Sequence, residues 1–204
     1  MTSWWNKNIE KRMDDFKSWV GDINQPSRVY CRKYIIEKNY ENIIDCGCGI
    51  ATDFYGYKND NCSIKYTGLD SCIYLVNFNR DKIEMIEAEL EVSLPIADNS
   101  YDCVYSREVI EHLSYYNKTI EEFIRIGKKE VIIVWFIFPS EDEDEINYWQ
   151  EEDLYHNKYN KNKLEQFISS NTKVDKLFWK EIDDFNYLTT PQTSKKHILH
   201  IILK

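Results

Sequence analysis

The chain has 204 residues and is 43% hydrophobic, which is enough for one domain of ordinary size with a full core. No run of about 18 apolar residues could cross a membrane, and the first residues lack the apolar stretch of a secretory signal, so we expect a soluble, cytoplasmic protein. The net charge of −9, without a stripe of Lys and Arg, argues against a nucleic-acid partner. The six cysteines form no Cys-x-x-Cys pair, so we expect reduced thiols that pack as small hydrophobes.

Residues 1–40 are expected to form a helical cap. Apolar residues recur every three or four positions, which is typical of one face of an amphipathic helix; they are Trp5, Ile9, Met13, Phe16 and Val20. Gly21 and Pro26 end this pattern, and a second helix is expected from Ser27 to about Lys38. The first helix could cover the edge of a sheet or form a lid over a ligand, and the sequence leaves both interpretations open.

Strands and helices alternate over residues 41–138. Strands are expected at 42–46, 63–69, 82–88, 101–105 and 129–137, and helices at 51–58, 71–79, 107–113 and 117–127. The run from Val131 to Phe138 is continuously apolar, which favours a parallel sheet covered on both faces.

The remaining residues are expected to complete the same domain. Pro139 and the acidic run 141–145 begin an insertion over residues 139–160, which we expect to border an acceptor site. A helix at 161–170 and strands at 174–181 and 196–203 follow, and the last strand alternates as an antiparallel addition would. The sequence thus predicts one Rossmann-like α/β domain over residues 1–204. Its seven-stranded sheet is mostly parallel, with helices on both faces and an antiparallel last strand.

A glycine-rich turn follows the first predicted strand. Asp45 ends the strand, and Gly47, Cys48 and Gly49 lead into the next helix. Glycines permit a tight turn and let a ligand approach the backbone, while the helix N-terminus offers free N–H groups. Asp70 ends the second strand, 21 residues after Gly49, where a carboxylate can accept hydrogen bonds from both hydroxyls of a ribose.

The segment after the third strand extends this pattern. The third strand leads into Glu87, Glu89 and Glu91, any of which could accept a hydrogen bond from an adenine amino group. Glu89 is the preferred choice, with Leu90 supplying a backbone N–H. A dinucleotide-binding dehydrogenase would need glycine at Thr52 to complete its Gly-x-Gly-x-x-Gly turn, so that class is disfavoured.

These motifs resemble the class I S-adenosylmethionine-dependent methyltransferases over about residues 41–138, most closely their small-molecule and sugar branch. Residues 44–49 look like the first motif of that family, although Ala51 stands where many members have a third glycine. Residues 94–102 and 106–113 resemble its fourth-strand region. The resemblance implies S-adenosyl-L-methionine as cofactor and S-adenosyl-L-homocysteine as product. It implies cofactor contacts from Asp45, Gly47, Cys48, Gly49, Asp70, Ser71, Glu89, Leu90, Ser106 and Arg107.

Two histidines are candidate catalytic bases. His112 ends the segment after the fourth strand, beside the expected acceptor, although Glu-His-Leu could also simply cap this turn. His156 follows the acidic insertion and is the second candidate. Aromatic residues near the end of the fifth strand and beyond it could line an acceptor pocket or belong to the core; they are Trp135, Phe136, Phe138, Tyr148 and Trp149.

The expected reaction is O-methylation of a small molecule or a sugar hydroxyl. One alternative rests on Glu108, Glu111 and His112, which would share one helix face and resemble the string of metal-dependent RNA 2′-O-methyltransferases, with His156 as a further ligand. The acidic charge argues against RNA, and we expect no metal. The other alternative is a non-catalytic binding module that keeps the fold. The sequence predicts no oligomeric state.

Overall fold

The computed structural model describes residues 9, 13, 14, 17, 22–151, 153–185 and 193–204. The helix expected over residues 5–20 therefore lies almost entirely outside the described residues. Among the described residues, no helix is both long and apolar enough to cross a membrane.

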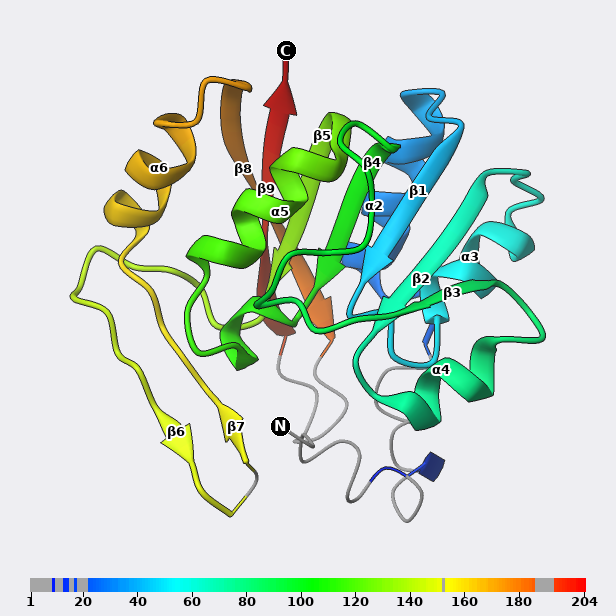
Figure 1. Cartoon of the computed structure of the whole chain (residues 1–204), viewed down its shortest axis with the longest axis horizontal. Coiled ribbons are helices and arrows are strands. Elements are labelled where there is room, and N and C mark those ends of the chain that lie inside the picture. The colour runs from blue at the N-terminus through cyan, green and yellow to red at the C-terminus, as the bar shows by residue number, and fades with distance from the viewer. Residues whose placement is uncertain (1–8, 10–12, 15–16, 18–21, 152, 186–192) are drawn as a thin grey trace.

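A seven-stranded sheet forms the centre of the structure (Figure 1), in the order β3-β2-β1-β4-β5-β9-β8. Strands β1 to β5 pair in parallel, and β9 lies antiparallel between β5 and β8. The strands are β1 (Asn42–Cys46), β2 (Lys65–Asp70), β3 (Glu84–Glu87), β4 (Tyr101–Arg107), β5 (Gly127–Trp135), β8 (Val174–Phe185) and β9 (Thr193–Leu203). The predicted Rossmann-like sheet, mostly parallel with an antiparallel last strand, is confirmed.

Helices cover both faces of the sheet, because successive residues of a buried strand point to opposite sides. On one face, Ile44 packs in the cluster that contains Phe123 of α5 (Asn117–Ile126). On the other face, Ile43 packs in the cluster that contains Ile35 of α2 (Pro26–Glu37). The remaining helices are α3 (Thr52–Asn59), α4 (Ile73–Asn79) and α6 (Lys161–Ser169).

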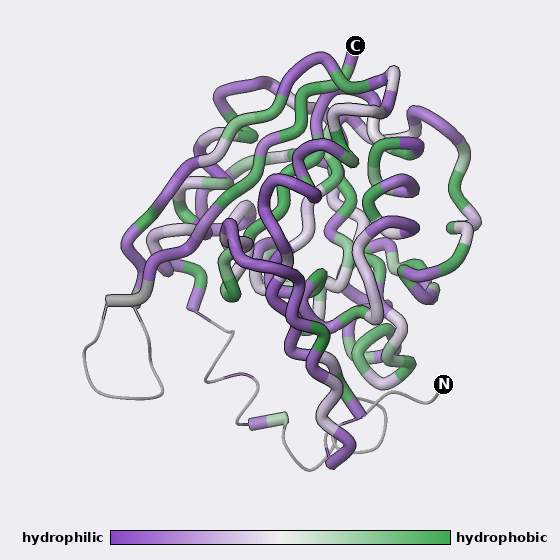
Figure 2. The backbone as a smooth tube through the Cα atoms, turned by 90° about the vertical axis from the view of Figure 1, so that its left-hand side faces the viewer, coloured by the Kyte–Doolittle hydropathy of each residue, from purple (hydrophilic) through white to green (hydrophobic). Residues whose placement is uncertain are grey.

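Local signals set several helix boundaries. Pro26 occupies the first turn of α2, where its missing N–H costs nothing. The Asn160 side chain accepts a hydrogen bond of 2.8 Å from the Lys163 N–H and so caps α6. In the tube coloured by hydropathy, hydrophobic stretches lie mainly in the strands and on the inner faces of helices (Figure 2).

The helix predicted over residues 107–113 is wrong. Strand β4 runs on to Arg107, which pairs with Val134 of β5, and the Glu108 N–H donates to the Val134 carbonyl at 2.8 Å. Glu108 then adopts a φ of +56°, which no right-handed helix allows, and only a short 3₁₀ turn, η1 (Ile110–His112), follows. The shared helix face proposed for Glu108, Glu111 and His112 therefore does not exist.

The acidic insertion contains a hairpin that the sequence did not predict. Strand β6 (Tyr148–Trp149) pairs antiparallel with β7 (Leu154–Tyr155). We call these two strands and the residues between them the β6–β7 hairpin. It extends from the same edge of the sheet at which the parallel strands end (Figure 1).

Candidate functional site

The carboxyl ends of β1, β2, β4 and β5 meet at one edge of the sheet, which is the usual place for a ligand in an open α/β fold. Helix α4 flanks this edge on one side and the β6–β7 hairpin on the other (Figure 1). The predicted site residues follow the ends of these strands, so the topology brings them to a single edge.

The glycine turn after β1 adopts a conformation that only glycine accommodates without strain. Gly47 has a φ of +79° and Gly49 a φ of +57°. The N–H groups of Gly47 and Cys48 donate to the Leu69 carbonyl at 2.7 and 3.1 Å, which fixes the turn to the end of β2. A Cβ atom on Gly47 would overlap the Val109 side chain, so the turn packs closely against the segment after β4.

The Asp70 carboxylate is held beside this turn. Its Oδ2 accepts a hydrogen bond from the Gly49 N–H and its Oδ1 accepts one from the Cys72 N–H, both at 2.9 Å. Burial raises the pKa of this carboxyl, and backbone N–H groups, that of Ser71 among them, partly oppose the rise. Each oxygen keeps a further acceptor position, so the fixed carboxylate can still receive two hydroxyls of a ribose.

Asp45 lies near the end of β1, two residues before Gly47, and is almost fully buried. The Tyr66 hydroxyl donates a hydrogen bond to its carboxylate. Burial and the nearby negative charge of Asp53 raise the pKa of Asp45 to about 7, although Tyr66 and Arg28 oppose the rise. Arg28 forms a buried ion pair with Asp53, so its guanidinium already has a partner inside the protein.

The three glutamates after β3 differ in their surroundings. Glu91 accepts a hydrogen bond of 2.9 Å from the Ser114 N–H, which ties it to the segment after η1. Glu89 is exposed, and its negative charge contributes to the raised pKa of Asp70, so the two carboxylates lie near each other. Leu90 is buried, and its carbonyl accepts a hydrogen bond from the Thr119 hydroxyl at 2.9 Å.

The side chains of Ser106 and Arg107 contact protein groups. The Ser106 hydroxyl donates to the Cys46 carbonyl at 2.9 Å. The Arg107 guanidinium donates to Ser27 and to Gln25, both at 2.7 Å, and lies 3.4 Å from the Asp184 carboxylate. These contacts join the end of β4 to the start of α2 and to β8.

His112 and His156, 44 residues apart in sequence, come together. Their ring centroids are 5.0 Å apart, and His112 Nδ1 lies 2.7 Å from the Tyr155 carbonyl oxygen. A carbonyl only accepts hydrogen bonds, so the neutral ring carries its proton on Nδ1 and a lone pair on Nε2. The His156 ring packs against Trp149 at 4.1 Å and the His112 ring lies 5.5 Å from Phe136.

The two glutamates of the alternative metal site have other partners. Although burial opposes it, the charges of Arg107 and Lys196 lower the pKa of Glu108 to about 2. Glu111 is fully buried, and its Oε1 accepts hydrogen bonds from the N–H groups of Phe136 and Ile137 at 2.7 and 3.2 Å. Within the described part of the chain, no group of three His, Cys, Asp or Glu residues could hold a metal ion.

Two asparagines that the sequence analysis did not select support the site. Asn79 of α4 is buried and donates to the Gly49 carbonyl at 2.8 Å, which holds the glycine turn from below. Asn157 is buried after β7; its side chain donates to the Leu113 carbonyl at 2.8 Å and accepts from the Asn147 N–H at 2.9 Å. No local motif marks either residue, because their partners are distant in sequence.

A hollow between α5 and α6 lies at the opposite, amino-terminal edge of the sheet and is lined by Asp98, Asn99, Glu121, Ile124, Arg125, Asn171 and Lys173. Its cationic groups already have partners. Arg125 pairs with Glu122 and Asp98 at 2.7 Å each, and Lys173 donates to the carbonyls of Ile124 and Arg125 at 2.7 and 3.1 Å. None of the predicted site residues lies there.

Residues 44–135 match the methyltransferase domain family. A structure of a S-adenosylmethionine-dependent methyltransferase from Thermotoga maritima matches with a TM-score of 0.64 and 10% identity, over the whole of both chains. A methyltransferase of Haloferax volcanii, in complex with the Trm112 methyltransferase activator, matches with a TM-score of 0.59 and 16% identity over 79% of this chain and 82% of that one. An uncharacterised protein of Methanocaldococcus jannaschii is 33% identical over 109 residues, which are 49% of this chain and 46% of that protein.

Residues 44–135, just under half of the chain, thus match a methyltransferase domain, and the whole chain has the fold of class I S-adenosylmethionine-dependent methyltransferases. The glycine turn and the fixed Asp70 carboxylate suit S-adenosylmethionine, since the turn leaves the backbone open to a ligand and each Asp70 oxygen keeps an acceptor position for a ribose hydroxyl.

Proposed function

We propose that the chain methylates a hydroxyl group of a small molecule or sugar. The observation that carries this proposal is the hydrogen bond between His112 Nδ1 and the Tyr155 carbonyl. In this tautomer the basic atom of the ring is Nε2. An imidazole with this tautomer can accept the proton of a hydroxyl group as that oxygen is methylated.

The cofactor is proposed to lie across the carboxyl ends of β1 and β2. The glycine turn lets the ligand approach the backbone, Asp70 would accept hydrogen bonds from the ribose, and Glu89 would face the adenine. Bound S-adenosylmethionine supplies an activated methyl group, so the protein mainly has to align the acceptor and remove its proton. Ser106 and Arg107 would act through their backbone atoms, because their side chains bind protein groups.

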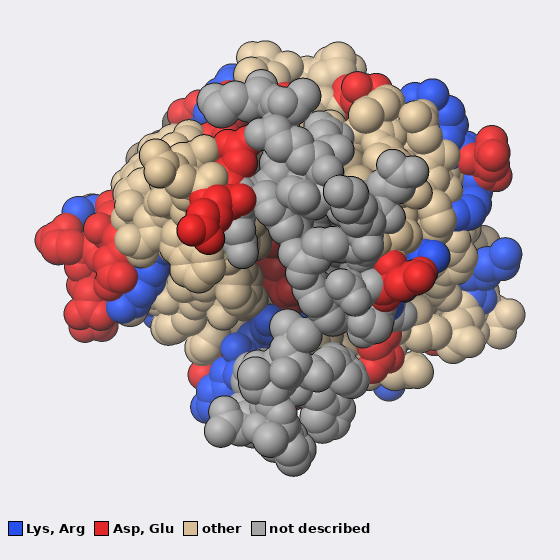
Figure 3. Space-filling view, turned by 90° about the horizontal axis from the view of Figure 1, so that it is seen from below, with Lys and Arg blue, Asp and Glu red and all other residues tan. Residues whose placement is uncertain are grey.

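His112 is proposed as the base and His156 as its neighbour in the acceptor site. The two rings lie in a T-shaped arrangement, with an interplanar angle of 84°. The metal-dependent RNA alternative has less support, since Glu108 pairs with Arg107 and Lys196, and Glu111 binds backbone N–H groups. On the face seen in Figure 3, acidic side chains of the described residues lie among the basic ones, so these residues form no purely basic stripe there.

The first test is calorimetric titration with S-adenosylmethionine. We expect micromolar binding to the wild type and a loss of at least about tenfold in Asp70→Ala, the size expected when a charged hydrogen-bonding group is removed. Asp98→Ala, an exposed residue at the opposite edge, is the matched control and should bind like the wild type. A folded wild type that does not bind the cofactor would favour the non-catalytic binding module.

The second test measures the release of S-adenosylhomocysteine with a panel of hydroxyl acceptors. His112→Ala should lower kcat by a factor of about 100 or more while leaving cofactor affinity intact. His197→Ala, a histidine stacked on Phe138, is the control. Turnover that His112→Ala does not change, or that a chelator abolishes, would contradict the assignment of His112 as a metal-free base.

A further inference from the structure

Four aromatic or imidazole rings form a continuous row at the edge of the candidate site. We call Trp149, His156, His112 and Phe136 the aromatic row. Neighbouring ring centroids are 4.1 Å apart for Trp149 and His156, 5.0 Å for His156 and His112, and 5.5 Å for His112 and Phe136. The row runs from the β6–β7 hairpin to the residue that follows β5, and so ends beside the carboxyl edge of the sheet.

The two ends of the aromatic row are open to solvent. Trp149 is 51% exposed and Phe136 is 38% exposed, although both are large apolar residues. Trp135, one residue before Phe136, is fully buried. Exposed aromatic rings beside a candidate site are typical of surfaces that bind a ligand.

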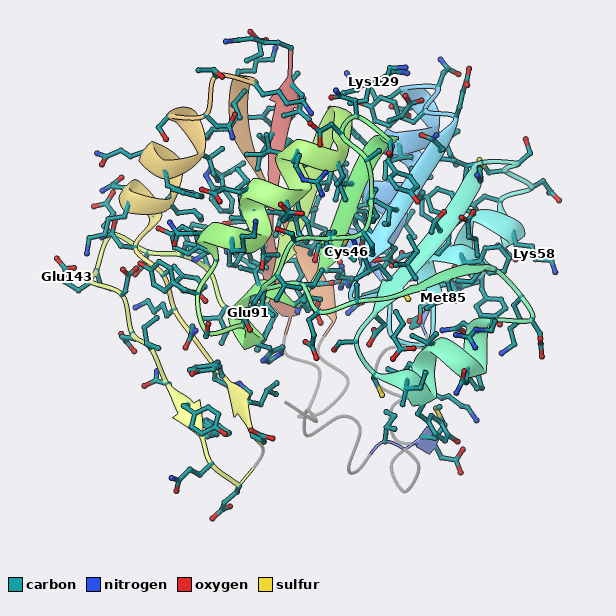
Figure 4. The ribbon with its side chains drawn as sticks, viewed as in Figure 1. Cys46, Lys58, Met85, Glu91, Lys129 and Glu143 are labelled. Carbon is teal, nitrogen blue, oxygen red and sulfur yellow. The ribbon has the colours of Figure 1, made fainter. Side chains whose placement is uncertain are left out.

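The acidic run beside the hairpin does not provide a cation site at the row. Four of its five acidic side chains lie within ion-pair distance of Lys158 or Lys163; they are Asp142, Glu143, Asp144 and Glu145. Figure 4 shows Glu143 on the outer side of the molecule, well apart from the hairpin. Glu143 and Asp144 thus pair with Lys163 of α6, and Asp142 and Glu145 pair with Lys158 inside the insertion.

The positive charges near the row also have partners. The Lys196 ammonium lies 5.5 Å from the centre of the Phe136 ring and forms an ion pair with Glu108 at 2.8 Å. Recognition of a phosphate or carboxylate would require clustered Lys or Arg side chains with open donors. The row therefore presents aromatic and imidazole rings, and the cation that lies over one of them, Lys196, is already paired with Glu108.

We propose that the aromatic row binds the acceptor, that the acceptor presents an uncharged sugar ring, and that Trp149 is the residue that selects it. This inference rests on the proposed function and narrows its substrate class. The electron-rich face of an indole attracts the C–H bonds on one face of a pyranose ring, as it attracts the positive edge of another ring. The hydroxyl groups at the rim of that sugar then lie level with the imidazoles of His156 and His112.

Saturation-transfer NMR on the protein loaded with S-adenosylhomocysteine tests this proposal. The expected ligands are methyl β-D-glucopyranoside and methyl α-D-mannopyranoside. The comparison probes are tyramine, which is cationic, glucose 1-phosphate, which is anionic, and catechol, which is planar. We expect a methyl pyranoside to bind the wild type with transfer to its ring C–H protons. Trp149→Ala should weaken this binding roughly three- to tenfold, and Trp149→Phe should weaken it less.

Tyr55→Ala is the matched control, because Tyr55 is an exposed aromatic residue of α3 outside the row. It should leave pyranoside binding unchanged, and all three variants should keep the wild-type affinity for the cofactor. The proposal is overturned if neither pyranoside binds, if tyramine or catechol binds in their place, or if Trp149→Ala binds like the wild type. Loss of cofactor binding by the wild type would instead contradict the proposed function, so the two failures are distinguishable.

Discussion

Gly47 has the backbone conformation that the glycine turn requires, with a φ of +79° and with Val109 packed against its Cα. An alanine there would be strained and would also overlap Val109, so the turn or the segment after β4 would have to move. The residue thus couples the cofactor turn to the segment that leads to His112.

We expect Gly47→Ala to lower the free energy of unfolding by about 1–3 kcal/mol. We also expect it to weaken cofactor binding by a larger factor than the substitution of a glycine that lies outside the turn. Urea unfolding and calorimetric titration measure the two effects. Gly127→Ala is the control, because Gly127 begins β5 at the opposite edge and an added Cβ would contact Phe123 and Leu203. If Gly127→Ala reduced cofactor affinity as much, the effect at Gly47 would be one of general stability.

At the scale of elements, Glu111 holds η1 against both ends of the insertion. Its Oε1 accepts hydrogen bonds from the N–H groups of Phe136 and Ile137, and its carbonyl accepts one from the Asn157 N–H at 2.9 Å. Burial raises the pKa of Glu111 from 4.5 to about 7, although these N–H groups oppose the rise.

This raised pKa gives a pH dependence of stability with a definite sign. Between about pH 4.5 and 7 the folded state holds a proton on Glu111 that the unfolded chain has lost, so the free energy of unfolding falls as pH rises through this window. At about 1.4 kcal/mol per pKa unit, the wild type should lose about 3 kcal/mol relative to Glu111→Gln by pH 8. Urea unfolding of both proteins at intervals of half a pH unit measures this difference in the free energy of unfolding. The exposed Glu121→Gln should instead parallel the wild type, and a wild-type curve parallel to Glu111→Gln would show that folding does not raise the pKa of Glu111.

The sequence predicted elements whose signals are local and missed those set by distant partners. Strand β1, the glycine turn and the carboxylate of Asp70 could be predicted because the signals for them lie in a few consecutive residues. The segment after β4 looked helical because Glu108, Glu111 and His112 have helical spacing, but the β4–β5 pairing continues to Arg107 and the ion pairs of Glu108 hold it at positive φ. The β6–β7 hairpin was missed because its two-residue strands are too short for an alternating pattern.

At the scale of the whole molecule, two described residues near the N-terminus pack against the turns at the carboxyl edge of the sheet. The described residues Ile9 and Met13 are buried in one apolar cluster with Ile50, Cys72 and Leu75. Ile50 follows the glycine turn and Cys72 lies two residues after Asp70, so both residues belong to the turns that would hold the cofactor. We propose that Ile9 and Met13 help to hold these cofactor turns in place.

Met13→Asp tests this proposal, because a carboxylate in the apolar cluster loses its hydration without a partner. In the wild type, S-adenosylmethionine at 100 times its Kd should stabilise the fold by about 2.7 kcal/mol, which raises the Tm by roughly 5–10 °C for a chain of this size. Met13→Asp should weaken cofactor binding at least about tenfold. The rise in Tm that the same concentration of S-adenosylmethionine causes should therefore be smaller in this variant. Val174→Asp, in the core near the far edge of the sheet, should lower the Tm of the free protein yet keep the wild-type Kd. An unchanged Kd in Met13→Asp would mean that the cluster of Ile9 and Met13 takes no part in holding the cofactor.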